Sequence, residues 1–369
     1  MIEAVIEACC RIERTPRVLQ VEGLFDLQPR PETRLQWRVA LPLDERPWQV
    51  GLIVGPSGCG KTTIARRLWP EQLAARPRWP RSRAVVDAFP ARMPIKEIVR
   101  LLSSVGFSSP PAWLRPFHAL STGQQFRVQL ARLLAEQPAL AVVDEFSAAV
   151  DRTVAQIGAH AVARTVRARG QRFVAITCHR DIEPWLNPDW VYRPETSTFT
   201  WRLLRQRPAI HLRIARVGRA AWPLFQPHHY LSERLAPSAV CFGAFWCGEQ
   251  PVAFSAWVPS LTRGGGRREH RTVTLPDYQG AGIGHALSTF VASLWKALGE
   301  RATSTTTHPA FIARRRRSPD WKLVRPLSLA RADGRGRVRH AVTRLTAGFE
   351  YVGPPLERTL AQRLMIAPP

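Results

Sequence analysis

The sequence has few lysines and methionines and no cysteine motif. Its 369 residues include three methionines and only four lysines, Lys61, Lys96, Lys296 and Lys322. Six cysteines, at positions 9, 10, 59, 178, 241 and 247, form no CxxC pair and have no Cys/His quartet nearby. This spacing predicts reduced thiols in a cytoplasmic protein, and it argues against a disulfide scaffold or a structural zinc site.

Long apolar runs are also missing. The longest weakly polar segment, residues 238–259, contains Glu249 and Gln250. Its polar and apolar residues alternate as in a β-hairpin, so we do not expect it to span a membrane. The N-terminus does not combine a basic end with an apolar run, so we expect no signal peptide. A length of 369 residues predicts two domains, each large enough for its own core.

Acidic residues are scarce relative to basic ones. The chain carries 28 acidic and 53 basic residues, for a net charge of +25 and a sequence pI near 11.4. Such a charge attracts polyanions, so nucleic acid is the leading class of partner. The alternative is a basic soluble enzyme without such a partner.

Residues 50–70 have the pattern of a strand at 50–54, a glycine-rich loop and a helix that begins near Thr62 and ends before Pro70. Backbone N–H groups of the loop and the helix N-terminus suit phosphate groups. We expect Lys61 to reach the β- and γ-phosphates of a nucleoside triphosphate and Thr62 to bind Mg²⁺. The predicted nucleotide-binding residues of this loop are Gly55, Pro56, Ser57, Gly58, Cys59, Gly60, Lys61, Thr62 and Thr63.

Three more motifs follow in order. LSTGQ, residues 120–124, precedes apolar residues at helical spacing, which predicts that Ser121 is a helix N-cap. The apolar run 139–143 ends at Asp144 and Glu145, and the β-rich run 172–177 precedes His179. Ligand groups lie at the carboxyl ends of strands in open α/β sheets, so Asp144 is predicted to bind Mg²⁺.

Together these four motifs resemble those of the ATP-binding-cassette (ABC) ATPases. The resemblance implies an ATP-bound homodimer, with Glu145 as the base for the attacking water, His179 as the γ-phosphate sensor and Asp151 at the dimer interface. It also implies that one chain closes the ATP of the other with its residues Ser121, Thr122, Gly123 and Gln124.

Three features depart from that family. Thr122 stands where the family usually has glycine, the segment between Lys61 and Ser121 is too short for the helical arm of transporter ATPases, and residues 85–94 contain no glutamine that could couple ATP to membrane subunits. The second and third departures argue against a transporter. The aromatic residue that stacks on adenine is left open among Phe25, Trp37 and Trp48.

The pattern changes after about residue 205. Strands are predicted within 238–246, 252–257 and 271–275, followed by PDYQGAGIG, a helix and a strand at 303–307. The loop predicts a phosphate cradle, although its glycines at every second position differ from the dinucleotide fingerprint. It resembles the acetyl-CoA motif of the GNAT acyltransferases. The implied contacts to acetyl-CoA or another acyl-CoA are Leu275, Gln279, Gly280, Ala281, Gly282, Ile283 and Gly284.

Acyl transfer to an amine needs a group that accepts the amine proton. The sequence offers several candidates without choosing between them: His228, His229, Tyr230, Glu269, His308 and Tyr351.

A run of basic residues is predicted to form a loop that contacts nucleic acid. A solvated basic loop is the alternative. The run consists of Arg314, Arg315, Arg316 and Arg317.

The predicted fold class is therefore α/β, with an ABC-type P-loop NTPase in residues 1–204 and an α+β GNAT-like acyl-CoA N-acyltransferase domain in residues 205–369. The predicted function is a soluble ATPase that controls acyl transfer at nucleic acid. Alternatives are acyl transfer to a protein or a small amine, and a C-terminal module that binds CoA or nucleic acid without turnover. A transporter ATPase is the weakest alternative.

Overall fold

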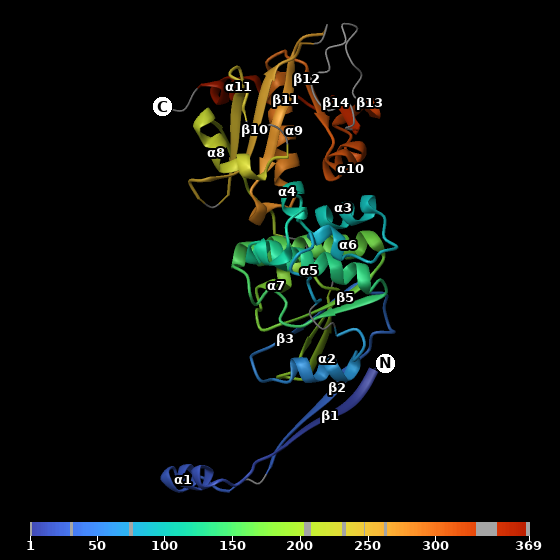
Figure 1. The fold of residues 1–369 in the computed structure, drawn as a ribbon, viewed down its shortest axis with the longest axis vertical. Helices are drawn as coiled ribbons and strands as arrows, with labels where there is room; N and C mark the ends of the chain where they lie inside the picture. Colours follow the sequence, from blue (N-terminus) through green and yellow to red (C-terminus); the bar gives the residue numbers. More distant parts are fainter. Residues whose placement is uncertain are drawn as a thin grey trace. The chain divides into compact units, whose positions relative to one another are not determined.

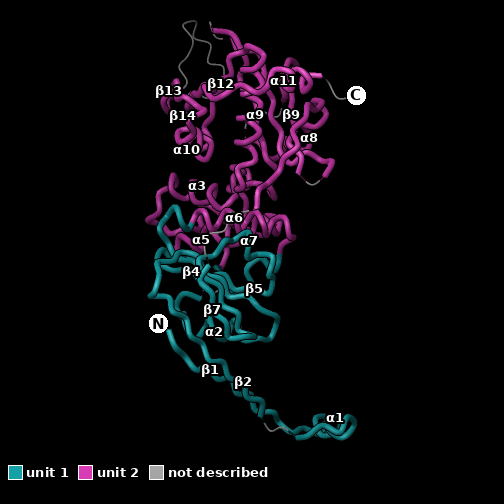
Figure 2. The backbone as a smooth tube through the Cα atoms, turned by 180° about the vertical axis from the view of Figure 1, so that it is seen from behind, with its two compact units in different colours: residues 1–77, 137–149, 166–207 teal, residues 78–136, 150–165, 208–369 magenta. Residues whose placement is uncertain are grey.

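The computed structural model describes residues 2–29, 32–73, 77–202, 208–230, 234–246, 248–261, 264–329 and 345–366. They divide into two compact units (Figure 2). Unit 1 contains residues 1–77, 137–149 and 166–207, and unit 2 contains residues 78–136, 150–165 and 208–369. The predicted boundary at residue 205 lies outside the described residues.

Unit 1 is built on a five-stranded sheet with the strand order β4-β5-β3-β6-β7. Its first four strands are parallel and β7 is antiparallel to β6. The strands are β3 (Val50–Val54), β4 (Leu140–Val143), β5 (Arg172–Thr177), β6 (Trp190–Arg193) and β7 (Thr198–Trp201), and the helices that follow β3 and β5 are α2 (Lys61–Leu68) and α7 (Ile182–Leu186). Every residue of β3 is buried, as expected for a central strand of a parallel sheet.

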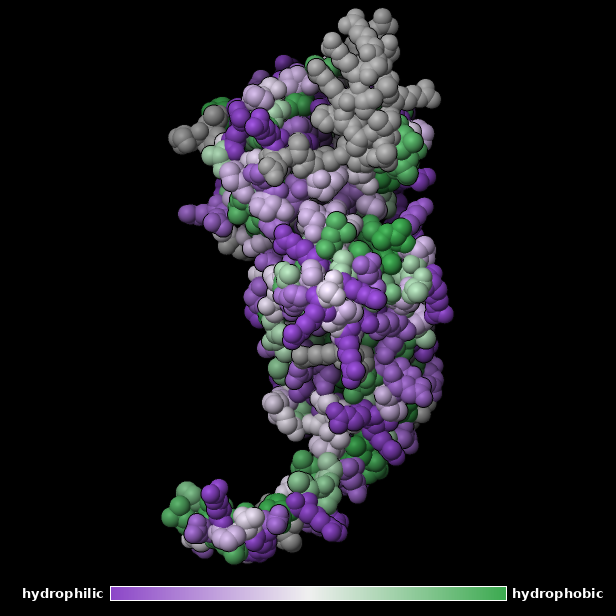
Figure 3. Space-filling view, viewed as in Figure 1, coloured by the Kyte–Doolittle hydropathy of each residue, from purple (hydrophilic) through white to green (hydrophobic). Residues whose placement is uncertain are grey.

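A long antiparallel hairpin precedes this sheet. β1 (Ile2–Arg11) pairs along its whole length with β2 (Glu32–Leu41), and α1 (Pro16–Leu24) lies between them at the far end of the hairpin (Figure 1). The hairpin joins the core at its sheet-proximal end, where Ile6, Val39 and Leu41 are buried. No residue of α1 is buried, and polar and apolar side chains mix on its surface (Figure 3).

The first part of unit 2 is helical. Its elements are the short turns η1 (Val85–Ala88) and η2 (Phe117–Ala119) and the helices α3 (Ile95–Ser104), α4 (Pro110–Trp113), α5 (Thr122–Glu136) and α6 (Arg152–Arg169). The end of α6 belongs to unit 1. α5 and α6 pack closely, because Gly158 leaves room for the ring of Phe126.

The second part of unit 2 is a seven-stranded sheet with the order β13-β14-β12-β11-β10-β9-β8. Its strands are β8 (Arg213–Val217), β9 (Val240–Phe245), β10 (Pro251–Pro259), β11 (Arg267–Thr274), β12 (Ala302–Thr306), β13 (Trp321–Leu329) and β14 (Leu345–Tyr351). The connecting elements are η3 (Arg219–Ala221), α8 (Trp222–Phe225), η4 (Gln226–His228), η5 (Pro276–Tyr278), α9 (Ile283–Ala297) and α10 (Pro309–Arg317), and α11 (Arg358–Met365) follows β14.

The only parallel pair described in this sheet is β11 with β12, and it is short. Arg267 pairs with Ala302 and Arg268 with Thr303, after which the two strands separate. α9 covers the sheet with a buried face that includes Leu287, Val291 and Leu294, as its apolar spacing predicts. The sheet is therefore open between β11 and β12 towards their carboxyl ends.

Candidate functional site

The glycine-rich loop after β3 is arranged to hold an anion. Gly58 and Gly60 adopt left-handed backbone angles, with φ of 81° and 89°, which glycine adopts without strain. Gly60 precedes α2 without a side-chain cap, and the Lys61 Nζ donates to the carbonyl oxygens of Gly55 at 2.8 Å and Pro56 at 2.6 Å. The free N–H groups of α2 and the ammonium fit phosphate.

Three neighbouring parallel strands bring the remaining predicted groups to the same edge. β5 lies between β3 and β4, with Val54 opposite Thr177 and Val143 opposite Ala175. The Gly55 N–H donates to the Thr177 carbonyl at 3.4 Å. Since these strands run in the same direction, Lys61, Asp144 and His179 all follow carboxyl ends at one edge of the sheet.

The backbone after β4 is strained at the predicted base. Glu145 and Ser147 have φ of 52° and 65°, a region that costs free energy in residues other than glycine and that clusters at functional sites. The Asp144 carboxylate accepts the Glu145 N–H at 2.8 Å, and the Phe146 N–H donates to Ile176 at 2.8 Å. These bonds hold the Glu145 side chain at the exposed surface.

The three candidate adenine-stacking residues have different surroundings. Trp48 is buried in the core against Trp190, and Phe25 lies at the end of α1 on the hairpin. Trp37 of β2 is half-buried and packs against Gly60 of the phosphate loop. Trp37 is therefore the candidate that the structure places beside the phosphate loop.

The residues of the LSTGQ motif form a capping box at the start of α5. Ser121 Oγ accepts the Gln124 N–H at 3.3 Å, and Gln124 Oε1 accepts the Ser121 N–H at 3.2 Å, so the predicted N-cap is confirmed. Thr122 and Gly123 lie in the first turn. Asp151 caps α6 in a similar way, because its carboxylate accepts N–H groups from Thr153 and Val154.

The second glycine-rich loop ends at α9. Gly282 has a φ of 92° and precedes α9 without a side-chain cap. A Cβ at Gly282 would lie 2.8 Å from Arg314 Nη1, so the guanidinium is next to the helix N-terminus. An open cavity of about 600 Å³ follows between α9 and α10, lined by His285, Ala286, Thr289, Phe290, Arg314, Arg317, Ser318 and Asp320. Two arginines and free helix N–H groups suit a phosphate-bearing ligand.

The start of the same loop faces the helices of unit 2. A Cβ at Gly280 would lie 2.8 Å from the Cα of Gly106, and Gln279 Oε1 accepts the Ser108 N–H at 2.8 Å. The Leu275 N–H donates to Val252 within the sheet. Gly280 and the Gln279 side chain are thus occupied by contacts within the protein. Ala281 is half-buried, and Ile283 and Gly284 are the first two residues of α9, where both are buried.

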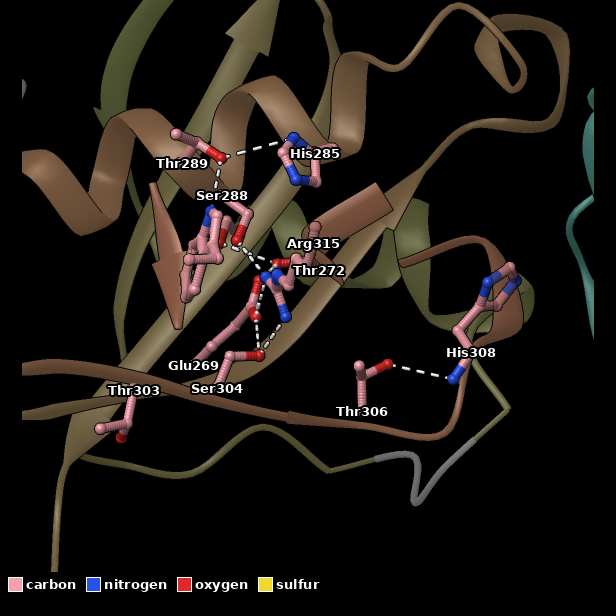
Figure 4. A network of polar contacts seen from close by, with 12 residues as sticks. Glu269, Thr272, His285, Ser288, Thr289, Thr303, Ser304, Thr306, His308 and Arg315 are labelled. Atoms are coloured by element: carbon pink, nitrogen blue, oxygen red, sulfur yellow. Dashed lines mark hydrogen bonds and ion pairs between the residues drawn. The ribbon is translucent and has the colours of Figure 1, made fainter. Parts of the chain in front are cut away.

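Glu269 is the centre of a buried polar network rather than an acid–base group (Figure 4). Its carboxylate pairs with Arg315 at 2.7 Å and accepts hydrogen bonds from Thr272 and Ser304. Burial would raise the pKa of Glu269, but the Arg315 charge and these hydrogen bonds lower it below its ordinary value. The structure therefore disfavours Glu269 among the six candidates, because the lowered pKa makes its carboxylate a weak proton acceptor and Arg315, Thr272 and Ser304 already bond to it.

The four-arginine run is helical and its side chains are not equivalent. The run ends α10, which begins at Pro309 behind the N-cap His308; the predicted loop is wrong because proline at the first helical position favours a helix. Arg315 is fully buried, and besides Glu269 it donates to Ser304 and Ser288. Arg315 is therefore unavailable to nucleic acid, whereas Arg314, Arg316 and Arg317 are exposed. The basic residues of 330–344 lie outside the described residues.

The cluster His228-His229-Tyr230 lies at the end of β12. Tyr230 OH accepts a hydrogen bond from Thr307 at 2.7 Å, and the ring of His229 stacks on Tyr230. Burial, followed by the charge of Arg115, lowers the pKa of His228. The structure therefore places Tyr230 of this cluster beside Thr307, directly after one of the two separating strands.

His308 and Tyr351 are held by structural contacts. His308 Nδ1 accepts the Ala310 N–H, so Nε2 carries the proton and donates to the Ser108 carbonyl at 3.1 Å. Burial lowers the pKa of His308. Tyr351 is buried, and its hydroxyl donates to Pro354 at 2.8 Å, which places it in the core.

One buried charge was not predicted from the sequence. Arg127 of α5 has no exposed surface and donates to carbonyl oxygens of Pro276 and Asp277. The available signal was a charge on an apolar helical face, because Ala131 and Leu134 follow Arg127 at spacings of four and seven.

The phosphate loop after β3, the acidic pair after β4 and the histidine after β5 define a P-loop ATPase of the ABC class. The Aliphatic sulfonates import ATP-binding protein SsuB 2 of Paraburkholderia xenovorans (strain LB400) is 32% identical over 192 residues, which cover 46% of this chain and 73% of that protein. The chain therefore belongs to the ABC ATP-binding proteins through its N-terminal part.

Other comparisons match a similar share of the chain. SsuB 3 of the same strain is 34% identical over 160 residues, 38% of this chain and 63% of the relative. Among solved structures, cbiO1 from Clostridium perfringens has a TM-score of 0.34 at 20% identity, covering 43% of this chain and 76% of that chain. A dimeric bacterial ABC transporter cassette has a TM-score of 0.36 at 15% identity, covering 43% and 87%. No family model matches the sequence.

Within the described residues, no helix combines the length and apolar character needed to cross a membrane.

Proposed function

We propose that the chain hydrolyses ATP as a cytoplasmic ABC-type homodimer and that its seven-stranded sheet binds an acyl-CoA for transfer to an amine. The observation that carries the ATPase proposal is the convergence of Lys61, Asp144, Glu145 and His179 at the ends of three neighbouring parallel strands. Membership of the ABC ATP-binding proteins supports it.

Each of these side chains is suited to one step of ATP binding or hydrolysis. Lys61 and the N–H groups of α2 bind the phosphates, while the Thr62 hydroxyl and the Asp144 carboxylate offer the oxygen ligands that Mg²⁺ prefers. Glu145 accepts a proton from the water that attacks the γ-phosphorus as the bond to ADP breaks. His179 donates a hydrogen bond to the γ-phosphate.

The proposed dimer uses the start of α5. Ser121 and Gly123 have no role in their own chain's phosphate loop under this proposal; they close the nucleotide of the partner chain. Asp151, which caps α6, lies at the same interface in the proposed dimer.

The Glu145→Gln variant tests this proposal. It should bind ATP, hydrolyse it at least a hundredfold more slowly and sediment as a dimer in ATP and Mg²⁺, because the proton acceptor is lost and the nucleotide persists. Lys61→Ala should bind ATP poorly and stay monomeric, and exposed Glu71→Gln is the control. A monomeric Glu145→Gln variant in saturating ATP would contradict the dimer.

The acyl-CoA proposal is supported by the opening between two parallel strands. β11 and β12 pair at two positions and then separate, which leaves backbone groups of both strands available to an extended ligand. The N-terminus of α9 and Arg314 lie next to the opening and suit the pyrophosphate. The cluster His228-His229-Tyr230 lies at the end of β12 and is our candidate for the acceptor side.

Calorimetry with acetyl-CoA tests this assignment. Arg314→Gln and Arg317→Gln should each weaken binding about tenfold, because each removes a charge-assisted contact to phosphate. Arg316→Gln is the matched control, since Arg316 is exposed in the same helix and does not line the cavity. Equal affinities for all three variants, or no binding by the wild type, would contradict the site.

The acceptor is proposed to be nucleic acid because of the net charge of +25. Incubation with labelled acetyl-CoA, followed by mass spectrometry of nucleic acid, protein and small amines, distinguishes the acceptors. Label on nucleic acid is expected; label only on protein or a small amine would replace this part of the proposal. Binding without any label would indicate a module that binds CoA without turnover.

A second candidate is an ATPase subunit of an import system, which is favoured by the similarity to import ATP-binding proteins. The absence of a glutamine in residues 85–94 weighs against it. Recovery of the full chain in a detergent-extracted membrane complex would favour this candidate, and recovery only as a free dimer would oppose it.

A further inference from the structure

The helix that begins at the ATP signature residues also holds the loop that precedes the acyl-CoA motif. Arg127 lies in the second turn of α5, and its guanidinium donates to the Pro276 carbonyl and, at 2.5 Å, to the Asp277 carbonyl. Both carbonyls belong to η5, which ends at Tyr278, next to Gln279. One buried side chain thus connects α5 with the start of the acyl-CoA loop.

The positive charge of Arg127 interacts with one carboxylate from each of two regions. Burial lowers the pKa of Arg127 to about 10, and the carboxylates of Asp277 and Asp151 act against that shift. Asp277 belongs to η5, which precedes the acyl-CoA loop, whereas Asp151 caps α6 and belongs to the proposed dimer interface. Both carboxylates therefore stabilise the buried guanidinium, which would be costly to bury without opposite charge.

A second contact begins within the signature residues themselves. A Cβ at Gly123 would lie 3.0 Å from Asp277 Oδ1 and 3.3 Å from the methyl groups of Val154. Gly123 therefore lies close to both α6 and Asp277 of η5, and a larger residue at position 123 would require these neighbours to shift.

A third set of contacts holds the loop at Gln279 against Gly106 and Ser108. The Ser108 N–H donates to Gln279 Oε1 at 2.8 Å, and the Ser108 carbonyl accepts from His308 Nε2 at 3.1 Å. A Cβ at Gly106 would lie 2.4 Å from the Gln279 carbonyl oxygen. Backbone packs directly on backbone here, so the loop cannot slide relative to the helices without breaking these bonds.

We propose that Arg127 is a positioning residue that couples ATP-driven dimerisation to acyl-CoA binding. The inference rests on the ATP dimer and the acyl-CoA site proposed above. When the partner's nucleotide fixes Ser121 and Gly123, α5 holds η5 through Arg127, and the following loop is ordered for the ligand. The coupling is reciprocal, so acyl-CoA strengthens the ATP-bound dimer by the same factor.

The test uses the full-length Glu145→Gln chain, which retains ATP. Calorimetry should show acetyl-CoA binding about tenfold tighter with saturating ATP and Mg²⁺ than without nucleotide, within the usual range of coupling. Arg127→Lys keeps the charge but loses the two-carbonyl geometry, and should reduce this factor to below threefold. Sedimentation should show the reciprocal effect, with acetyl-CoA lowering the dimer dissociation constant about tenfold.

Two further variants keep the result interpretable. Asp277→Asn should also reduce the coupling factor, because it removes the carboxylate charge that acts on Arg127 and lies beside Gly123. Arg132→Lys is the matched control, because Arg132 lies in the same helix and donates to the Arg78 carbonyl at 2.7 Å, away from the acyl-CoA loop. It should retain the full factor.

The outcomes separate the coupling from the functions on which it rests. A coupling factor of one in the Glu145→Gln chain with Arg127 unchanged, with ATP dimerisation and acetyl-CoA binding both intact, would overturn the coupling alone. Absence of acetyl-CoA binding would overturn the acyl-CoA assignment, and hydrogen exchange of residues 276–284 would then decide the coupling. ATP should slow that exchange in the Glu145→Gln chain and leave it unchanged when Arg127→Lys is added; no ATP effect in either would overturn the inference.

Discussion

Trp37 of β2 packs directly on Gly60 of the phosphate loop. A Cβ at Gly60 would lie 2.3 Å from Trp37 Cε2, and Gly60 has a φ of 89°. Any larger residue at position 60 would both clash with the indole and strain the backbone. The contact places the indole of Trp37 beside the glycine-rich loop.

We expect Trp37→Ala to weaken ATP binding about tenfold, since stacking on a base contributes roughly 1–3 kcal/mol. Trp37→Phe should restore most of the affinity. Calorimetry with ATP and with inorganic triphosphate separates stacking from distortion of the loop, because triphosphate has no base. An equal loss for both ligands would show that Trp37 supports the loop and does not stack on adenine.

Because Arg315 pairs with buried Glu269, we expect substitution of Arg315 to destabilise the protein much more than substitution of its neighbour Arg316. Arg315→Met should lower the free energy of unfolding by about 3–5 kcal/mol, because it leaves Glu269 buried without its partner. Combining it with Glu269→Gln should recover part of the loss. Exposed Arg316→Gln should stay within about 0.5 kcal/mol. Urea unfolding followed by circular dichroism measures all four proteins; similar losses at positions 315 and 316 would contradict the role of the network.

The lowered pKa values of four histidines predict that the free energy of unfolding decreases at acid pH. Burial is the main cause that lowers the pKa values of His228, His270, His285 and His308, to about 4 for His270 and His285. The unfolded chain therefore binds more protons than the folded chain below pH 6.5, and the free energy of unfolding should fall from there towards pH 4.

His308→Gln should flatten this dependence by about one proton, or roughly 1.4 kcal/mol per pH unit in the titrating range. Its amide can still donate to the Ser108 carbonyl. Urea midpoints measured between pH 4 and 7 give the slope. An unchanged slope in this variant would show that His308 is not protonated on unfolding in that range.

The net charge predicts salt-dependent binding of duplex DNA. Replacing Arg314, Arg316 and Arg317 by glutamine, with Arg315 kept, should flatten the log–log salt dependence by up to about 0.9 per lost phosphate contact. The control replaces exposed Arg81, Arg83 and Arg92, which changes the charge equally. Filter binding from low to moderate salt measures both. Equal effects of the two variants would indicate non-specific attraction, and no effect of either would remove nucleic acid as a partner through this helix.

Much of the ATP site was predictable because its motifs are local. The phosphate loop, the N-cap at Ser121 and the strand ends at Asp144 and His179 each depend on residues adjacent in sequence, and hydrogen bonds within a few residues fix them. The strands at 50–54 and 172–177 have the predicted bounds, because buried parallel strands give continuous apolar runs.

The roles of long-range partners were not predictable in this way. Glu269 and Arg315 are 46 residues apart, and only the tertiary fold brings β11 and α10 together so that they form an ion pair. Without that neighbour, Glu269 has the same local pattern as an acid–base residue, and Arg315 the same pattern as a surface arginine.

The sequence by itself thus determined the class of ATPase, the order of its motifs and the positions of both glycine-rich loops, because these features depend on local backbone geometry and chemistry. Only the tertiary structure decided which charges are buried and which segments pack together. Arg127 is the clearest case: its partners lie 149 and 150 residues away. A hydrogen bond across that distance leaves no periodicity in the sequence, since it depends on how α5 and η5 pack.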